Sequence, residues 1–182
     1  MTWILLALGA VVLVWALIAF NRLVRLRNQM RTAWADIDVQ LSRRHDLVPQ
    51  LVGAVGGHAD HERAVLQAVT ELRSRALDLR GPARLGAVES ELERALGRLL
   101  ALREAYPDLK ASENFAQLQR DLVAVENQLQ YARRFYNGAV RDYNDTIGRL
   151  PDLLIARIGG FSAGEFFQSD GGSRTAVEVR LP

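Results

Sequence analysis

The apolar positions of this chain begin with an uninterrupted run from Trp3 to Phe20, which contains 18 residues and no charge. At about 1.5 Å of rise per residue, a helix of this length measures about 27 Å and just crosses the hydrocarbon core of a bilayer. A cleaved secretory signal is the alternative, but it would carry a basic stretch before the run and a small-residue cleavage site after it. Neither is present, so we predict a single transmembrane anchor over residues 1–21.

Beyond the anchor, apolar residues recur at steps of three, four or seven, which predicts that the first helix continues as an amphipathic helix. These positions are Leu23, Leu26, Met30, Ala33, Ile37, Leu41, Val48, Leu51 and Val55. Gly53, Gly56 and Gly57 each lower helix propensity by about 1 kcal/mol relative to alanine and indicate a turn or kink. Two further amphipathic helices are expected over roughly residues 60–79 and 85–102, with a break at RGPAR between them.

The clearest pattern belongs to the next helix, for which Ser112 is a suitable N-cap and Pro151 marks the end. Its apolar positions alternate steps of three and four, which is a heptad repeat. They are Phe115, Leu118, Leu122, Val125, Leu129, Ala132, Tyr136, Ala139 and Tyr143. Four amphipathic helices with short connections predict an all-α fold, in which the N-terminal transmembrane helix continues into an up-and-down antiparallel four-helix bundle over residues 22–157.

After the bundle, the composition shifts to glycine, serine and charge, and we expect a flexible C-terminal tail over residues 158–182. The short alternating run TAVEVRL at its end could add a strand to the edge of a partner's sheet, but it is too short to be stable alone.

Charge and composition exclude several kinds of chemistry and binding partner and indicate on which side of the membrane the bundle lies. The chain has 23 basic residues, 21 acidic residues and no cysteine, which excludes disulfides, thiol nucleophiles and thiolate metal sites. Acidic residues interleave with the arginines, so no nucleic acid is expected as a partner. Arg22, Arg25, Arg27 and Arg31 follow the anchor before any acid and, by the positive-inside rule, predict a bundle on the cytoplasmic side. These membrane-flanking arginines could also attract anionic membrane lipids.

Three separated blocks of this sequence resemble the LemA family. They are AWADIDVQLSRRHDLVPQLV, LLALREAYPDLKASENFAQLQRDLVAVENQLQYARRFYNGAVRDYN and LPDLLIARIGGF, and the likeness covers nearly all of residues 21–167. The resemblance implies a membrane-anchored four-helix bundle in bacteria, in a family with a poorly defined biochemical role and no established catalytic residues. The expected location is therefore the bacterial cytoplasmic membrane, which the chain would cross once.

The strongest motif for metal chemistry is HADHE, in which His58 and His61 lie one helical turn apart and Glu62 adjoins them. Two imidazoles at that spacing can share a metal ion. However, the spacing differs from that of the HExxH helix, and a third ligand would have to come from elsewhere. We expect a solvated helix start here, and hence no metal and no cofactor.

Two other groups of titratable residues are interpreted as ordinary surface. His45 and Asp46 are neighbours on a helix and point about 100° apart, so they do not face one another as an acid–base pair. Glu89 and Glu93 lie in a stripe interleaved with arginines, which is typical of a solvated face. No catalytic residues are predicted, and we expect that the chain is not an enzyme.

Arg44 is unusual because it falls on the apolar stripe of the first helix, about 20° from Ile37 and about 40° from Val48. A charge at such a position needs an acidic partner or access to water. If the first and last long helices are antiparallel neighbours, matching their ends sets Arg44 level with Glu126 and Asn127.

The same register sets Asn28 opposite Asn144. Five residues thus share one polar layer between the two helices, and we interpret them as a structural polar seam that fixes the register, as a buried asparagine does in coiled coils. They are Asn28, Arg44, Glu126, Asn127 and Asn144. A polar ligand-binding pocket is the alternative, and the substitution Arg44→Leu separates the two because a seam that only fixes register should leave a folded domain. Pro49 removes the hydrogen bond to the carbonyl of His45 and is expected to kink the helix nearby.

The favoured function is a membrane-anchored, non-catalytic helical scaffold or assembly protein of the bacterial cell envelope, which associates with itself or with other membrane proteins. One alternative is a sensor or signalling module that transmits a change from the membrane through the first helix. A metal-dependent enzyme that uses His58, His61 and Glu62 is a further alternative.

Overall fold

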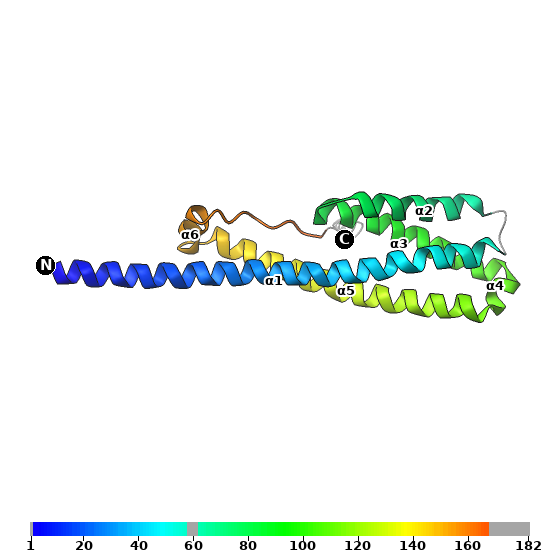
Figure 1. Ribbon diagram of the computed structural model, residues 1–182, viewed down its shortest axis with the longest axis horizontal. Coiled ribbons are helices and arrows are strands. Elements are labelled where there is room, and N and C mark those ends of the chain that lie inside the picture. Colours follow the sequence, from blue (N-terminus) through cyan, green and yellow to red (C-terminus); the bar gives the residue numbers. More distant parts are fainter. Residues whose placement is uncertain (1, 58–61, 168–182) are drawn as a thin grey trace, which may run out of the picture. The chain divides into compact units, whose positions relative to one another are not determined.

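The computed structural model describes residues 2–57 and 62–167. Within these residues the chain is helical and contains no strand, which confirms the all-α class (Figure 1). The helices are α1 (Thr2–Gly56), α2 (Arg63–Asp78), α3 (Pro82–Ala105), α4 (Pro107–Ala111), α5 (Glu113–Gly148) and α6 (Asp152–Ile158). The C-terminal strand considered for TAVEVRL, and most of the tail predicted to be flexible, lie outside the described residues.

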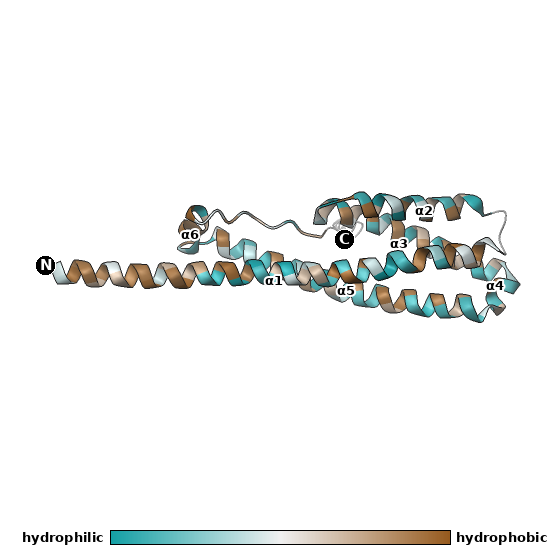
Figure 2. Cartoon of the chain, viewed as in Figure 1, coloured by the Kyte–Doolittle hydropathy of each residue, from teal (hydrophilic) through white to brown (hydrophobic). Residues whose placement is uncertain are grey.

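The N-terminal part of α1 is exposed on all sides although it is apolar. It is long and apolar enough to cross a membrane, and only 6% of its apolar stretch is buried. In Figure 2 this stretch of helix carries the brown of hydrophobic residues along most of its length. A core helix of a water-soluble protein would bury such residues, because exposed apolar area is unfavourable in water. The exposed apolar helix is therefore suited to serve as a membrane anchor.

The helices divide into two compact units, which α1 and α5 both enter. We call residues 38–131, together with the described residues 166 and 167, the bundle unit. Residues 2–37 and 132–165 form the anchor unit.

The bundle unit is built from the C-terminal part of α1, from α2 and α3, and from the N-terminal part of α5. Short connections reverse the chain between successive long helices, which gives the up-and-down order (Figure 1). Every helix of this unit contributes to one core: Val48, Leu51, Val55, Val69, Leu92, Ala95, Leu96, Leu99, Leu109, Phe115, Leu118 and Leu122. The core residues of α1 and α5 all come from the apolar stripes predicted for those two helices.

Local chain chemistry sets the helix boundaries in the bundle unit. The amide of Phe115 donates to Ser112 Oγ at 3.3 Å, which is the N-cap contact expected at the start of α5. Gly81 has a φ of 92° and precedes Pro82, the first residue of α3. The sequence analysis did not predict α4, whose first residue is also a proline.

The anchor unit contains a third element beside α1 and α5. It consists of α6 and the segment 159–165 that follows it, and we call this segment alone the strap. Gly160 ends α6 with a φ of +66°, and a Cβ on Gly159 would lie 2.6 Å from the ring of Phe161. Asn144 of α5 holds the strap through two hydrogen bonds: it accepts from the amide of Gly164 at 2.8 Å and donates to the Gly164 carbonyl at 2.9 Å.

A second attachment of the strap comes from Tyr136, whose hydroxyl donates to the carbonyl of Glu165 at 2.7 Å. The ring of Tyr136 also packs against Trp34 of α1 with centroids 5.3 Å apart. Burial, and to a smaller extent the carboxylate of Glu165, raise the pKa of Tyr136 to about 12. Tyr136 therefore links α1, α5 and the strap through a phenol that stays protonated at ordinary pH.

Candidate functional site: a buried charge network

Arg44 lies in the interior of the bundle unit with no solvent exposure. Its Nη1 donates to Glu89 Oε2 at 2.8 Å, and its Nη2 forms a short ion pair with the carboxylate of Glu126. Glu93 Oε2 lies 3.9 Å from the same Nη2. One guanidinium therefore faces three carboxylates, two of them from α3 and one from α5. Multiple charged acceptors of this kind are the usual requirement for holding a cation inside a protein.

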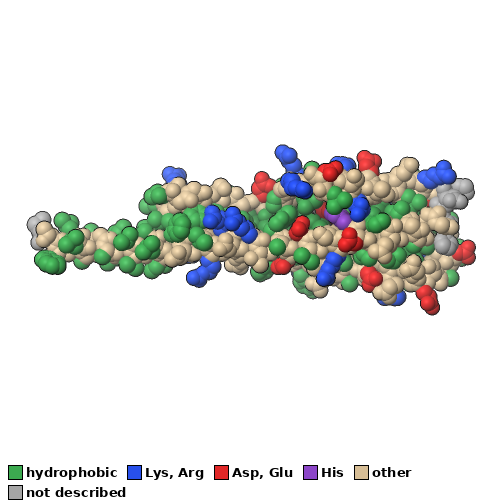
Figure 3. Space-filling model, in the orientation of Figure 1, with side chains coloured by type: hydrophobic (Ala, Val, Ile, Leu, Met, Phe, Trp, Pro, Cys, Tyr) green, Lys and Arg blue, Asp and Glu red, His purple; other side chains and the backbone are tan. Residues whose placement is uncertain are grey.

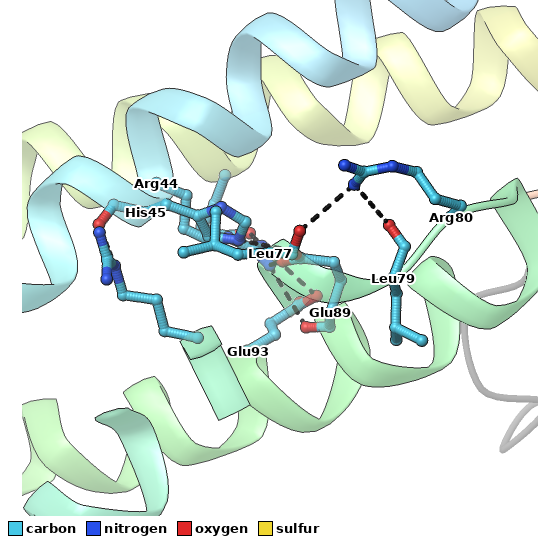
Figure 4. Close-up of polar contacts among 9 residues, drawn as sticks. Arg44, His45, Leu77, Leu79, Arg80, Glu89 and Glu93 are labelled. Carbon is cyan, nitrogen blue, oxygen red and sulfur yellow. Dashed lines mark hydrogen bonds and ion pairs between the residues drawn. The ribbon is translucent and has the colours of Figure 1, made fainter. Parts of the chain in front are cut away.

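Glu89 is the second fully buried member of this network, and its position corrects the sequence analysis. It has no solvent exposure, so the interpretation of Glu89 as a solvated surface residue is wrong. Its Oε1 lies 2.7 Å from His45 Nε2, while its Oε2 accepts from Arg44. His45 is also buried, which corrects its assignment to the surface, whereas Asp46 is exposed. Figure 4 shows Arg44 and His45 reaching from α1 toward Glu89 and Glu93.

Helical spacing contained a signal for Glu89. This residue follows Leu85 by four positions and precedes Leu92 by three, so it lies on the buried stripe of α3. The argument that singled out Arg44 applies to Glu89 without change. Two opposite charges on the apolar stripes of two different helices are the pattern expected of a buried ion pair.

Pro49 lies inside α1, which continues beyond it to Gly56. Proline has no amide hydrogen, so the carbonyl of His45 has no intrahelical donor. The structure supplies another donor from α2, because Arg73 Nε donates to this carbonyl at 2.8 Å. Arg73 therefore replaces the backbone donor that Pro49 lacks. The kink at Pro49 stays a prediction.

Of the five residues proposed for a polar seam, the structure brings together Arg44 and Glu126. Asn28 and Asn127 are exposed, and Asn144 bonds to the backbone of Gly164. A continuous seam through all five residues is therefore absent from the described residues. The polar layer of the bundle unit instead consists of Arg44, His45 and Glu89 with Glu93 and Glu126 at its edge, and we call these five residues the charge network.

The membrane-flanking arginines lie where the apolar stretch of α1 ends. In Figure 3 the first charged side chains beyond this stretch are basic. Arg22 pairs with Asp152 of α6 at 3.2 Å, and the guanidinium of Arg27 lies 4.9 Å from the centroid of the Phe161 ring. Arg25 and Arg31 are exposed. Two of the four arginines thus contact the third element of the anchor unit.

The centre of the charge network is closed to substrates, because Arg44 and Glu89 have no solvent exposure. Two hollows in the described surface are lined by residues of α2 and α3, namely Leu66, Gln67, Thr70, Glu71 and Ser74 for one and Leu72, Glu91, Arg94 and Arg98 for the other. Neither includes a member of the network. The arrangement can orient helices and hold charges, and the members that reach solvent are Glu93 and Glu126 at its edge, both of which face the guanidinium of Arg44.

Most of the HADHE motif, including His58 and His61, lies outside the residues that the structure describes, so the metal interpretation stays a hypothesis. Glu62 is described, and its Oε1 accepts a hydrogen bond from the hydroxyl of Tyr106 at 3.4 Å. Within residues 2–57 and 62–167, no group of three or more histidine or acidic side chains is arranged to hold a metal ion.

An exposed apolar helix that continues into an antiparallel helical bundle defines a class of membrane-associated all-α protein. Within this class, residues 33–181 match the LemA family, and the chain belongs to that family. Magnetosome protein MamQ 2 of Paramagnetospirillum magneticum is 24% identical over 187 residues, which cover 88% of this chain and 69% of that protein. Protein LemA of Metamycoplasma hominis is 27% identical over 131 residues, which cover 70% of this chain and 58% of that protein.

A third relative, magnetosome protein MamQ of Magnetospirillum gryphiswaldense, is 23% identical over 188 residues. These residues cover 88% of this chain and 69% of that protein. The similarity to the MamQ proteins extends over most of the chain rather than over one motif.

Proposed function

We propose that this protein is a membrane-anchored, non-catalytic helical scaffold of the bacterial cell envelope, which assembles with itself or with other membrane proteins. The observation that carries the proposal is the contrast between its interior and its surface. Arg44 and Glu89 are paired in the interior with no solvent exposure, whereas large apolar side chains remain exposed on α5. Tyr131 and Phe135, one helical turn apart, are 63% and 53% exposed. Exposed aromatic side chains of this kind favour a contact surface for another protein.

The relatives support the same proposal. The names that they carry refer to the magnetosome or to the LemA family, and none of these names states an enzymatic activity. Membership of the LemA family and an exposed apolar helix favour a role at a membrane.

Crosslinking tests assembly directly, because the chain has no native cysteine. A single cysteine at Phe135→Cys, crosslinked in native membranes with a bifunctional thiol reagent, should give a dimer-sized product. Arg141→Cys is a matched control, because Arg141 is exposed on the same helix about 120° around from Phe135. Mass spectrometry of any product identifies whether the partner is a second copy or another membrane protein. A chain that remains monomeric and forms no product with either variant contradicts the proposal.

We place the bundle unit on the cytoplasmic side of the membrane, because four arginines follow the span before any acid. A cysteine at Leu77→Cys, on the exposed surface of α2, should react with a membrane-impermeant maleimide only after permeabilisation. Thr2→Cys, at the start of α1, should react with the same maleimide in cells whose outer envelope is permeabilised and whose cytoplasmic membrane is intact. The reverse pattern would place the bundle unit outside.

One observation favours a sensor as the second candidate function. A single helix, α1, contains the apolar span, Arg44 and Pro49. A sensor requires an element with two populated arrangements, whose balance depends both on the membrane span and on the bundle unit. Fluorine NMR of a probe at Gln50→Cys in lipid nanodiscs should then show two exchanging signals, whereas a plain scaffold gives one.

The metal-enzyme alternative is tested by metal analysis of the purified chain and of its double His58→Ala and His61→Ala variant.

A further inference from the structure

The polarity of α6 is reversed compared with a helix on the surface of a water-soluble protein. Its inward side carries Asp152 and Ala156, which are buried. Leu154 and Ile158 lie one turn apart and are 53% and 86% exposed, and Leu150, in the turn before α6, is 73% exposed. The spacing of four residues between Leu154 and Ile158 places these two side chains about 40° apart around α6. A short helix with an exposed apolar side is suited to an apolar environment rather than to water.

Two contacts fix α6 and the strap at the level where the apolar span of α1 ends. Arg22 pairs with Asp152 at 3.2 Å, and the ring of Phe20 packs edge-on against Phe161 with centroids 5.6 Å apart. Phe20 is the last residue of the uncharged run, and Arg22 is the first charged residue after it. If α1 spans a bilayer, Phe20 and Arg22 lie at the boundary between acyl chains and headgroups. The contacts then place α6 at the same boundary.

We propose that α6 is a second membrane contact, which lies in the membrane–water interface with Leu154 and Ile158 turned into the acyl chains. This inference rests on the proposed anchoring of the chain by α1. Two observations favour lipid over a protein partner. Asp152 of α6 pairs with Arg22 directly after the span, and Phe161 of the strap packs against Phe20 at its end, so α6 adjoins the end of the apolar span. In addition, three exposed side chains provide far less than the roughly 800 Å² per partner that a stable protein interface buries.

The charges around α6 agree with this placement. Arg157 on α6 is exposed, as is Arg25 on α1. Basic side chains beside an interfacial apolar surface can reach anionic headgroups while the apolar side chains enter the membrane. The only acid of α6, Asp152, is buried and paired with Arg22, so it does not face the lipid.

The test uses the full chain with single introduced cysteines, each labelled with an environment-sensitive fluorophore and reconstituted in vesicles of phosphatidylcholine and phosphatidylglycerol. Ile158→Cys carries the test label. Val11→Cys, within the span, is the lipid reference, and Leu77→Cys, on α2, is the aqueous reference. Because all three side chains are exposed, labelling them does not disturb the core. Collisional quenching is measured with lipid-borne nitroxides and with aqueous iodide.

We expect the label at position 158 to show blue-shifted emission, to lose most of its emission to lipid-borne nitroxides and to resist iodide, as the label at position 11 does. Quenching by iodide equal to that at position 77 would overturn the inference. Protection from both quenchers would also overturn it, since this result means that protein covers α6. If the label at position 11 is itself quenched by iodide, the anchoring by α1 fails. A lipid-like signal at position 11 with an aqueous signal at position 158 refutes only the role of α6.

Discussion

The bundle unit and the anchor unit share the helices α1 and α5 but hold them by different interactions. In the bundle unit, four helices enclose an arginine and a glutamate with no solvent exposure. In the anchor unit, the third element includes the strap, whose main-chain groups bond to Asn144 and Tyr136. Losing one partner of a buried ion pair leaves an uncompensated charge, whereas losing a neutral hydrogen bond costs about 1 kcal/mol. The loss of a single polar group should therefore lower stability much more in the bundle unit than in the anchor unit.

The largest effect is expected from Glu89→Gln in the bundle unit. Glutamine keeps the size of the side chain but removes the charge that faces Arg44 and His45 in a closed interior. Breaking a buried pair in this way should lower the free energy of unfolding by about 3–5 kcal/mol. Denaturant titration of the full chain in detergent measures the change.

The matched control is Glu93→Gln, because Glu93 faces the same guanidinium at 3.9 Å but its side chain is 40% exposed. A partly solvated pair contributes at most about 1 kcal/mol, so this variant should stay close to the parent protein. Equal losses from the two variants would mean that the interior of the bundle unit is not closed to water.

A smaller effect is expected when Arg73 is replaced by methionine, which leaves the His45 carbonyl without its donor. This hydrogen bond is part-buried and its donor is charged, so its loss should lower the free energy of unfolding by about 1–3 kcal/mol. The substitution Pro49→Ala restores a backbone amide that can donate to the same carbonyl. Arg73→Met should therefore destabilise the Pro49→Ala protein less than it destabilises the parent, as measured by a double-mutant cycle. Additive losses would show that Arg73 does not compensate for the proline.

In the anchor unit, Asn144→Ala removes both hydrogen bonds to Gly164. We expect the local stability of the strap to fall by about 1–2 kcal/mol, because each neutral hydrogen bond contributes about 1 kcal/mol. Hydrogen exchange of the Gly164 amide should become faster, while exchange in the core of the bundle unit stays unchanged. Asn127→Ala is the matched control, since Asn127 is exposed on the same helix. Faster exchange throughout the bundle unit would contradict the separation between the two units.

The smallest effect concerns pH. Burial raises the pKa of Tyr136 from the usual value of 10.0 to about 12, so the folded protein retains this proton where the unfolded chain releases it. The resulting stability is fully present below pH 10.0 and is lost as the pH rises toward about 12. Ultraviolet titration should show a late-ionising tyrosine that is absent from Tyr136→Phe. An unchanged titration curve in this variant would assign the late ionisation to another residue.

The sequence by itself determined the helical class, the exposed apolar span and most of the core. The apolar stripes on α1 and α5 could be recognised because a helix repeats every 3.6 residues, so side chains three and four positions apart share one face. The position of Arg44 on a stripe also followed from this spacing. The short helix α6 could not be recognised in this way, since its seven residues make only about two turns, too few to establish a period.

Only the tertiary structure decided which groups meet across helices. Helical spacing places Arg44 on an interior face, but it does not show that Glu89 of α3 and Arg73 of α2 are the side chains that satisfy this part of α1. Likewise, Asn144 binds the strap rather than an asparagine on α1. Local sequence controls the direction in which a side chain points from its own helix, whereas its partners depend on the packing of segments far apart in the chain.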